Sequence, residues 1–379
     1  MHPFKIPFSR PYLSGNEYRY IEAAVQSGRI SGGGPFGKRC EMLLSKLIGS
    51  SDVLLTSSCT SALEIAAFLL DALPGDEVIL PSFTYVSTAN AFVIRGMKPV
   101  FIDIHPDTLN LDERLLESLI TSKTRAIVPV HYAGVACQMD EIGQISSKYK
   151  LTLIEDAAHA LGGTFSGRPL GTFGAIGVYS FHETKNLSCG EGGAMVINEA
   201  RLLERAEILR EKGTNRTQFI QGLMHQYTWM DYGSSYALSD LQAAYLLAQL
   251  ESFEEIQRKR AQIWNDYYQE LRFLEQAGHL TLPKSIPQAF SSYHLFYVLL
   301  PNKEERDSLM HWLQSHGILA VFHYIPLHNS PMGSRYHDSI RDLPVTRSVS
   351  ERILRLPFYT GLSRRDQSEV IERLYEYFQ

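Results

Sequence analysis

The sequence predicts an α/β protein with a mostly parallel, seven-stranded sheet between helices and a smaller α+β domain at its C-terminal end. Short apolar, β-branched runs alternate with helical patterns over the first two thirds of the chain, as in βαβ units. These runs are almost continuously apolar, which is typical of strands covered on both faces. The pattern changes after about residue 235. With 379 residues, 44% of them hydrophobic, the chain has enough apolar material for two cores.

The strands of the main sheet are predicted at seven short runs, each bounded by polar or helical sequence. They lie at 52–55, 76–80, 98–103, 125–130, 151–156, 176–181 and 194–197. Helical patterns at 61–73, 111–120 and 139–150 connect several of them. Because ligands of open parallel sheets bind at the carboxyl ends of the strands, the polar residues after these strands are the candidate site residues.

The sequence pattern of the last third of the chain predicts an architecture different from the βαβ units of the first two thirds. Residues 238–274 form one very long helical pattern that connects two domains. Antiparallel strands are expected within 291–300 and 318–328, and helices at 306–317 and 366–378. We therefore divide the chain into a large domain, 1–250, and a small domain, 251–379, and expect the N-terminal segment to pack on the small one.

Composition restricts the class of protein. A net charge of −5 gives no reason to expect nucleic acid or an anionic membrane as a partner. No run approaches the roughly 20 apolar residues of a membrane span, so a cytoplasmic protein is expected. The four cysteines lack CxxC spacing, and His323 and His328 have no carboxylate or cysteine nearby in sequence. We therefore expect neither a disulfide framework nor a metal site.

A hydroxyl-rich stretch, "TSSCTSALEIAA" at 56–67, lies between a predicted strand and an apolar helix. Ser and Thr are common N-cap residues, which is the simpler interpretation. The second interpretation is a phosphate site, because the N–H groups and the dipole of a helix N-terminus favour an anion. The four hydroxyl residues of 57–61 are more than a cap requires, and both interpretations stay open.

Two further strand ends carry residues suited to a flat heterocycle. Phe83 and Tyr85 follow the strand at 76–80, either as core aromatics or as a surface on which a ring stacks. Asp156 ends the strand at 151–156, and His159 follows it closely. Asp156 is either the N-cap of a helix or a carboxylate that holds a proton on a ring nitrogen.

Lys185 lies in "SFHETKNLSCGEGG" (180–193), after a predicted strand and among hydroxyls and glycines. A solvated loop lysine is the ordinary interpretation. A lysine held at a strand end and poorly hydrated can instead react with a carbonyl group. The hydroxyl residues at 57–61, the aromatic Tyr85, the carboxylate Asp156 and Lys185 all lie at ends of predicted strands. Together they predict a site for pyridoxal phosphate (PLP).

"GGGPFG" (32–37) formally matches the dinucleotide fingerprint and precedes a helical pattern. The segment before it, "EYRYIEAAVQSGRI", has a helical pattern instead of a strand. The structural context of a nicotinamide site is therefore missing, and a nicotinamide oxidoreductase is not expected.

Seven stretches distributed in order along the chain resemble the DegT/DnrJ/EryC1/StrS sugar aminotransferases of PLP fold type I. They are "SSCTSALEIA", "PSFTYVSTANA", "VHYAG", "IEDAAHALG", "GVYSFHETKN", "GEGGAMV" and "DLQAAYLLAQL". The resemblance covers roughly residues 1–360. It implies a homodimer with active sites at the subunit interface, a nucleotide-sugar substrate and L-glutamate as amino donor.

The resemblance also implies roles for individual residues. Lys185 would attach the cofactor and transfer a proton, and Asp156 would pair with the pyridine nitrogen. His159 would lie by the ring, and Tyr85 would stack on it. The phosphate would be held by three hydroxyl residues: Thr60, Ser61 and Ser180. Many family members have asparagine where this chain has Ser235, and that asparagine reaches the phosphate of the neighbouring subunit.

Four stretches, "FHETKN", "REKGTNR", "DYGSSYALSDLQAAY" and "AVFHYIPLH", suggest one subgroup. Its activity is amination of dTDP-4-dehydro-6-deoxy-D-glucose to dTDP-4-amino-4,6-dideoxy-D-galactose, for a surface polysaccharide such as enterobacterial common antigen. The alternatives are an aminotransferase for another nucleotide sugar, such as a UDP-4-keto sugar, and a non-catalytic regulator. In a PLP sugar dehydratase of the same fold, histidine replaces the lysine, which "ETKN" argues against.

Overall fold

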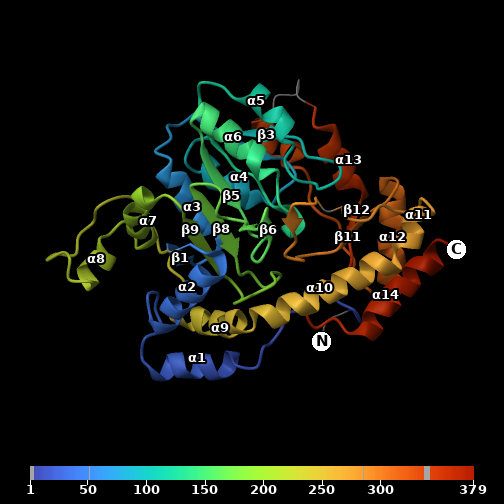
Figure 1. The fold of residues 1–379 in the computed structure, drawn as a ribbon, viewed down its shortest axis with the longest axis horizontal. Helices are drawn as coiled ribbons and strands as arrows, with labels where there is room; N and C mark the ends of the chain where they lie inside the picture. The colour runs from blue at the N-terminus through green and yellow to red at the C-terminus, as the bar shows by residue number, and fades with distance from the viewer. Residues whose placement is uncertain (1–3, 51, 285, 337–341) are drawn as a thin grey trace.

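The computed structural model describes residues 4–50, 52–284, 286–336 and 342–379. Its centre is a seven-stranded sheet (Figure 1). In chain order the strands are β1 (Val53–Thr56), β2 (Glu77–Pro81), β3 (Lys98–Ile102), β4 (Thr124–Ile127), β5 (Thr152–Asp156), β8 (Ile176–Ser180) and β9 (Gly193–Ile197). Their order across the sheet is β1-β9-β8-β5-β4-β2-β3, and only β9 runs antiparallel to its neighbours. The predicted mostly parallel seven-stranded sheet is confirmed.

Helices cover both faces of the sheet because successive strand residues point to opposite sides. Leu54 belongs to the core on one face, while its neighbours Val53 and Leu55 belong to the core on the other. The first face packs on α3 (Cys59–Leu69), α4 (Val86–Val93) and α7 (Leu203–Arg210). The second packs on α2 (Pro35–Ile48), α5 (Leu116–Leu119), α6 (Met139–Tyr149) and α9 (Asp240–Glu251). The outer helix α1 (Glu17–Gln26) lies against α9.

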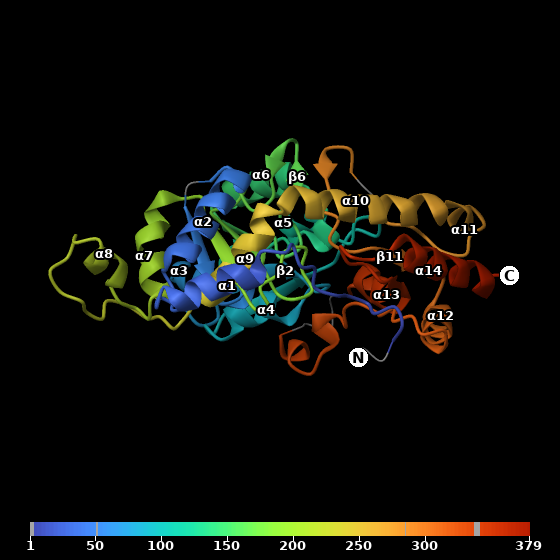
Figure 2. The same cartoon turned by 90° about the horizontal axis from the view of Figure 1, so that it is seen from below.

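The C-terminal part has a separate core beside the sheet domain (Figure 2). Its helices are α10 (Phe253–Glu270), α11 (Arg272–Gln276), α12 (Lys303–Ser315), α13 (Pro344–Arg352) and α14 (Arg364–Tyr377). They surround an antiparallel pair, β11 (Tyr297–Leu299) with β12 (Ile353–Arg355). Ile6 is fully buried in this core, where it pairs with Ile318. The division at residue 250 stays a prediction.

Two expectations for this part are wrong in detail. The helical pattern 238–274 is not one helix, because backbone dihedrals at Ser252 (φ −104°, ψ 14°) and Leu271 (φ −90°, ψ −2°) separate α9, α10 and α11. Residues 318–328 form no strand and make only isolated bridges, Ile6–Ile318 and Val321–Arg355. The strand that pairs with β11 is β12, which the sequence pattern did not reveal.

The remaining elements are short. A small sheet joins β6 (Thr164–Phe165), β7 (Arg168–Pro169) and β10 (Ala289–Phe290). Single 3₁₀ turns lie at Glu113–Leu115, Tyr132–Gly134, Ala200–Leu202, Leu327–Asn329 and Gly333–Arg335. An arm containing α8 (Arg216–Ile220) projects from the sheet domain in both views. No helix within the described ranges is long and apolar enough to cross a membrane.

Candidate active site

A cavity of ≈ 790 Å³ opens at the edge of the sheet where β1, β2, β5 and β8 end. These four strands run in the same direction, so the polar residues that follow them meet at this edge. Phe8 of the N-terminal segment and Arg355 of β12 line the same cavity, so three distant parts of the chain form its wall. Lys185, Asp156, His159, Tyr85, Thr60 and Ser180 all line it.

Lys185 lies five residues after the end of β8, in a turn where its backbone N–H donates to the carbonyl of His182 at 2.9 Å. Its side chain is half-buried at the cavity. Burial lowers the pKa of its amine to about 8, although Cys59 and Asp156 act in the opposite direction. A substantial fraction of the amine is therefore neutral near physiological pH and can act as a nucleophile or a base.

Asp156 is the last residue of β5 and its carboxylate is buried. Thr88 Oγ1 donates to Asp156 Oδ2 at 2.8 Å, and the Ala158 N–H donates to Oδ1 at 3.1 Å. Burial raises the pKa of this carboxyl group, and the two hydrogen bonds only partly oppose that effect. A cationic N–H placed beside Asp156 would compensate the desolvated charge.

The hydroxyl residues of 57–61, which we call the hydroxyl cup, surround the N-terminus of α3. Ser58 is the N-cap of α3, and its Oγ accepts the Ser61 N–H at 3.0 Å. Thr60 Oγ1 donates to Ser87 Oγ at 2.8 Å, and both side chains line the cavity. Ser61 is buried behind the cup, does not line the cavity and bonds the hydroxyl of Ser57 at 2.8 Å. Capping thus occupies part of this set, and Thr60 lies in the first turn of α3, where it lines the cavity.

Gly193, the first residue of β9, allows β9 to approach this cup. A Cβ atom there would lie 2.4 Å from the backbone nitrogen of Cys59. Gly193 pairs with Thr56 on one side and with Ser180 on the other, so it lies between two strand ends that lead into the site.

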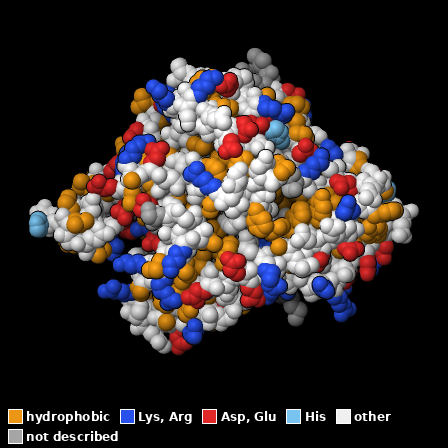
Figure 3. Space-filling view, in the orientation of Figure 1, with side chains coloured by type: hydrophobic (Ala, Val, Ile, Leu, Met, Phe, Trp, Pro, Cys, Tyr) orange, Lys and Arg blue, Asp and Glu red, His pale blue; other side chains and the backbone are white. Residues whose placement is uncertain are grey.

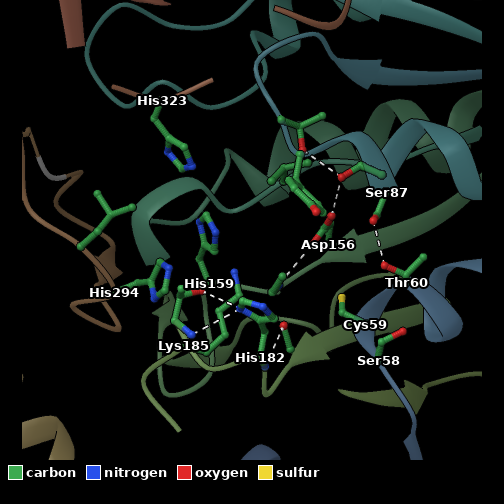
Figure 4. A pocket seen from close by; sticks show the side chains of 18 of the residues that line it. Ser58, Cys59, Thr60, Ser87, Asp156, His159, His182, Lys185, His294 and His323 are labelled. Carbon is green, nitrogen blue, oxygen red and sulfur yellow. Dashed lines mark hydrogen bonds between the residues drawn. The ribbon is translucent and has the colours of Figure 1, made fainter. Parts of the chain in front are cut away.

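Three buried histidines form one side of the cavity, opposite Asp156, Thr60 and Ser87 (Figure 4). The rings of His159 and His294 stack with centroids 4.1 Å apart, and His159 and His323 lie 6.4 Å apart and nearly parallel. Burial lowers the pKa of each well below the usual value, so the rings are neutral. His159 Nδ1 is buried without a hydrogen-bond partner among the described residues.

The two aromatics after β2 have different positions. Phe83 is fully buried and packs against Tyr132 with ring centroids 5.1 Å apart, so it is a core residue. Tyr85 is 60% exposed, lines the cavity and has its ring centroid 6.5 Å from that of Tyr324. Of these two aromatics, Tyr85 is the one that presents its ring to the cavity.

Of three other candidates, His323 lines the cavity, whereas Ser235 and His328 do not. Ser235 is exposed, pairs with Glu211 and is not among the residues that line the cavity. His323 Nδ1 bonds the hydroxyl of Tyr132 at 2.8 Å, whereas His328 Nδ1 bonds Ser82 Oγ at 2.6 Å. These two histidines therefore have separate hydrogen-bond partners.

The glycine-rich segment 32–37 leads into α2, whose N-terminus is already occupied by a carboxylate of the same chain. Asp240 Oδ1 accepts the Gly37 N–H at 2.8 Å, and Oδ2 accepts the Phe36 N–H at 3.4 Å. A Cβ atom on Gly34 would lie 2.3 Å from the Asp240 carboxylate. The glycine there makes room for Asp240, which explains the false dinucleotide match.

Several cavity residues were not predicted from the sequence: Phe8, Ser87, His294, Tyr324 and Arg355. Four of them come from the N-terminal segment or from beyond residue 290, and no strand-end rule identifies them. Ser87 could have been found, because it follows β2 only two residues after Tyr85.

The residues present fit PLP. A hydroxyl-lined helix N-terminus suits the phosphate, a buried carboxylate suits a protonated ring nitrogen, and an amine of lowered pKa suits the aldehyde. His159, which lines the cavity, adds a buried Nδ1 atom that has no hydrogen-bond partner among the described residues.

Comparisons with known proteins agree with this chemistry. A model of the DegT/DnrJ/EryC1/StrS aminotransferase family matches residues 11–375. An uncharacterized protein of Methanocaldococcus jannaschii is 33% identical over 371 residues, which cover 97% of this chain and 96% of that protein. The aminotransferase TlmJ from Streptoalloteichus hindustanus has a TM-score of 0.90 at 30% identity, with 98% of each chain covered.

Spr1654 from Streptococcus pneumoniae, described as a sugar aminotransferase, has a TM-score of 0.89 in its PLP form, at 28% identity and with 97% of each chain covered. These likenesses confirm PLP fold type I and PLP as the cofactor. The chain belongs to the DegT/DnrJ/EryC1/StrS aminotransferase family and is a PLP-dependent sugar aminotransferase.

Proposed function

We propose that the enzyme transfers the amino group of L-glutamate to the 4-keto carbon of dTDP-4-dehydro-6-deoxy-D-glucose. The product would be dTDP-4-amino-4,6-dideoxy-D-galactose, so the enzyme would be a dTDP-4-amino-4,6-dideoxygalactose transaminase. The amino transfer is supported by one observation above all: Lys185, with its lowered pKa, shares a cavity with Asp156 and the hydroxyl cup. The four subgroup stretches, including "FHETKN", support the choice of substrate.

Bound PLP supplies an electron sink for the carbon that carries the amine. In our proposal Lys185 holds the cofactor and then acts as the base that moves a proton at the reacting carbon, which an amine with a pKa about 8 can do near neutral pH. Asp156 keeps the pyridine nitrogen protonated, because its buried carboxylate gains a cationic partner there.

The other proposed contacts orient the cofactor. Thr60 and Ser180 hold the phosphate at the α3 N-terminus, and both line the cavity. The Thr60 hydroxyl, which donates to Ser87 Oγ in the single chain, would turn to the phosphate. Ser61 acts through the serine hydroxyls that it bonds. His159 lies against the ring, held by stacking on His294, and Tyr85 covers the outer face.

We further propose a homodimer with the active sites at the interface. The arm 216–235 supports it, since large hydrophobic side chains on it are exposed in the single chain (Figure 3). They are Phe219, Ile220, Leu223, Met224, Tyr227, Trp229, Met230 and Tyr232. Ser235 at the base of this arm would then reach the cofactor phosphate of the neighbouring subunit, as asparagine does in many relatives.

A cytoplasmic location and a role in a surface polysaccharide such as enterobacterial common antigen complete the proposal. The four cysteines are free thiols, which suits a reducing compartment. The acceptor is then a nucleotide-activated sugar, the form in which monosaccharides enter glycan assembly.

The test is to mix PLP-loaded enzyme with L-glutamate and then with the keto sugar. Glutamate should bleach the visible absorbance of the lysine-bound cofactor, and dTDP-4-dehydro-6-deoxy-D-glucose should restore it with formation of a 4-amino sugar. A UDP-4-keto sugar serves as the competing substrate. Turnover of the UDP sugar alone would move the enzyme to another subgroup, and a protein that binds no PLP would refute the proposal.

A further inference from the structure

Arg355 is a partly buried cation that lines the cavity from the small core. It is the last residue of β12. Among the described residues, Arg355 and Lys185 are the arginine and the lysine that line the cavity. Its guanidinium lies 4.5 Å from the centroid of the Phe8 ring, and Nη2 donates a long 3.4 Å hydrogen bond to the carbonyl of Phe322. Nε is buried without a partner, and no carboxylate in the described part of the chain pairs with Arg355.

A guanidinium in this environment favours the binding of an anion. Burial lowers the pKa of Arg355, which reflects the cost of removing its charge from water. Burying a cation without a counter-charge is unfavourable, and a carboxylate that accepts two parallel N–H groups compensates it well. The chain itself supplies no such carboxylate here, so a ligand is the natural partner.

Four anionic groups would enter this cavity: the cofactor phosphate, the diphosphate of the nucleotide sugar, and the α- and γ-carboxylates of glutamate. The γ-carboxylate is separated from the reacting carbon by two methylene groups, and the two phosphate-bearing groups also have positions that do not suit Arg355. The cofactor phosphate belongs to the hydroxyl cup at the N-terminus of α3, beyond the end of β1. The diphosphate of the nucleotide sugar is attached to C1, across the sugar ring from the reacting C4. The α-carboxylate of an amino acid, in contrast, is bonded to the carbon that reacts.

Arg355 lies close enough to the reacting centre to act on its groups electrostatically. After burial, its charge contributes to lowering the pKa of Lys185, and it does so for His323 as well. Arg355 and Lys185 line the same cavity, so an anion bound by Arg355 shares that cavity with the Lys185 amine. This position matches a carboxylate one bond from the reacting carbon better than a diphosphate on the far side of a sugar ring.

We propose that Arg355 binds the α-carboxylate of the amino donor and thereby places the donor's amine toward Lys185. The inference rests on the proposed function, because it assigns a residue to one of the two substrates of that reaction. Arg355 belongs to β12, which pairs with β11 in the small core, whereas Lys185 follows β8 of the large sheet. The donor would thus be held between the two parts of the protein.

The test compares Arg355→Gln with Arg365→Gln, a matched change at an exposed position of α14. The glutamate half-reaction is followed by bleaching of PLP-loaded enzyme, and the keto-sugar half-reaction by colour recovery of pyridoxamine-loaded enzyme. Arg355→Gln should raise the glutamate concentration for half-maximal rate by roughly 10- to 100-fold. The keto-sugar half-reaction should stay within about twofold of the wild type, as should both half-reactions of Arg365→Gln.

A binding measurement adds a readout that needs no turnover. Glutarate, a dicarboxylate without an amine, is titrated calorimetrically into holoenzyme, and Arg355→Gln should weaken its binding by roughly tenfold or more. Arg355→Lys, which keeps the charge but loses the planar fork, should recover part of the affinity. Melting temperatures of all variants identify any that fail to fold.

Three results would overturn the inference: unchanged glutamate kinetics in Arg355→Gln, equal losses in both half-reactions, or a loss confined to the keto-sugar half. The last would assign Arg355 to the diphosphate. If wild-type enzyme is not bleached by glutamate, the proposed donor fails, and the glutarate titration still decides whether Arg355 binds a carboxylate.

Discussion

Gly193→Ala is the sharpest test of how the cofactor cup is built. The added Cβ would lie 2.4 Å from both the Cys59 nitrogen and the Ser58 carbonyl carbon, whereas ordinary contact begins at 3.4 Å. The difference, 3.4 minus 2.4, requires β9 and the start of α3 to separate by 1.0 Å. Both contacting atoms are backbone atoms, so no side-chain rotation can relieve the clash.

We expect this change to destabilise the protein by about 1–3 kcal/mol, the usual cost of overpacking. Because the displaced segment is the cup itself, PLP affinity should also fall, by roughly 10- to 100-fold for a shift of about 1 Å. Thermal unfolding of the apoprotein measures the first effect, and equilibrium titration with PLP measures the second.

Gly143→Ala is the matched control. Gly143 lies inside α6, and no heavy atom would approach its Cβ within 4 Å. Alanine there should stabilise the protein by about 0.5–1 kcal/mol through helix propensity and leave PLP binding unchanged. If Gly193→Ala melts with the wild type and binds PLP within about twofold of it, the cup is not set by this backbone contact and the reasoning fails.

Further changes test the titrating groups. Lys185→Ala should abolish turnover while PLP still binds noncovalently, and retained turnover would refute the proposed role. In the wild type, the rate of PLP attachment should increase as the pH is raised through about 8, because the Lys185 amine loses its proton there. Asp156→Asn should lower turnover by roughly 10²–10³-fold. Because the folded pKa of Asp156 is raised, its carboxylate costs stability at neutral pH, so the same variant should raise apoprotein stability by about 1 kcal/mol; a lower melting temperature would contradict this. His159, His294 and His323 have folded pKa values well below 6.5, so the unfolded chain binds more protons below that pH. Apoprotein stability should therefore fall as pH drops below about 6.5, by up to ~1.4 kcal/mol per pH unit for each histidine, and a flat profile from pH 7 to about 5 would contradict their buried, neutral state.

The main sheet and part of the candidate site could be predicted because both follow from local pattern and strand direction. The seven apolar runs became the seven strands within a few residues, since buried parallel strands are marked by composition alone. Asp156 was found because it ends a strand at the shared edge, and Lys185 because it follows one.

Other features depend on tertiary contacts that sequence pattern does not encode. The break at Ser252 lies within a sequence that is helical on both sides, and only packing of α9 and α10 on different parts of the protein sets it. Within "RILRLPF" the sequence pattern does not distinguish Arg355 from an ordinary surface arginine. Nothing in that stretch indicates that Arg355 lines a cavity together with residues as distant in sequence as Lys185 and Asp156.

The wall of the cavity runs from Phe8 to Phe358, almost from one end of the chain to the other. During synthesis the large sheet is complete once residue 197 has left the ribosome, whereas the cavity can close only when the last wall residue has emerged. Until then Lys185 lacks the part of the cavity wall that comes from His294, His323, Tyr324 and Arg355. Removal of the first nine residues would likewise take Phe8 and Ser9 from the wall without touching any strand of the main sheet.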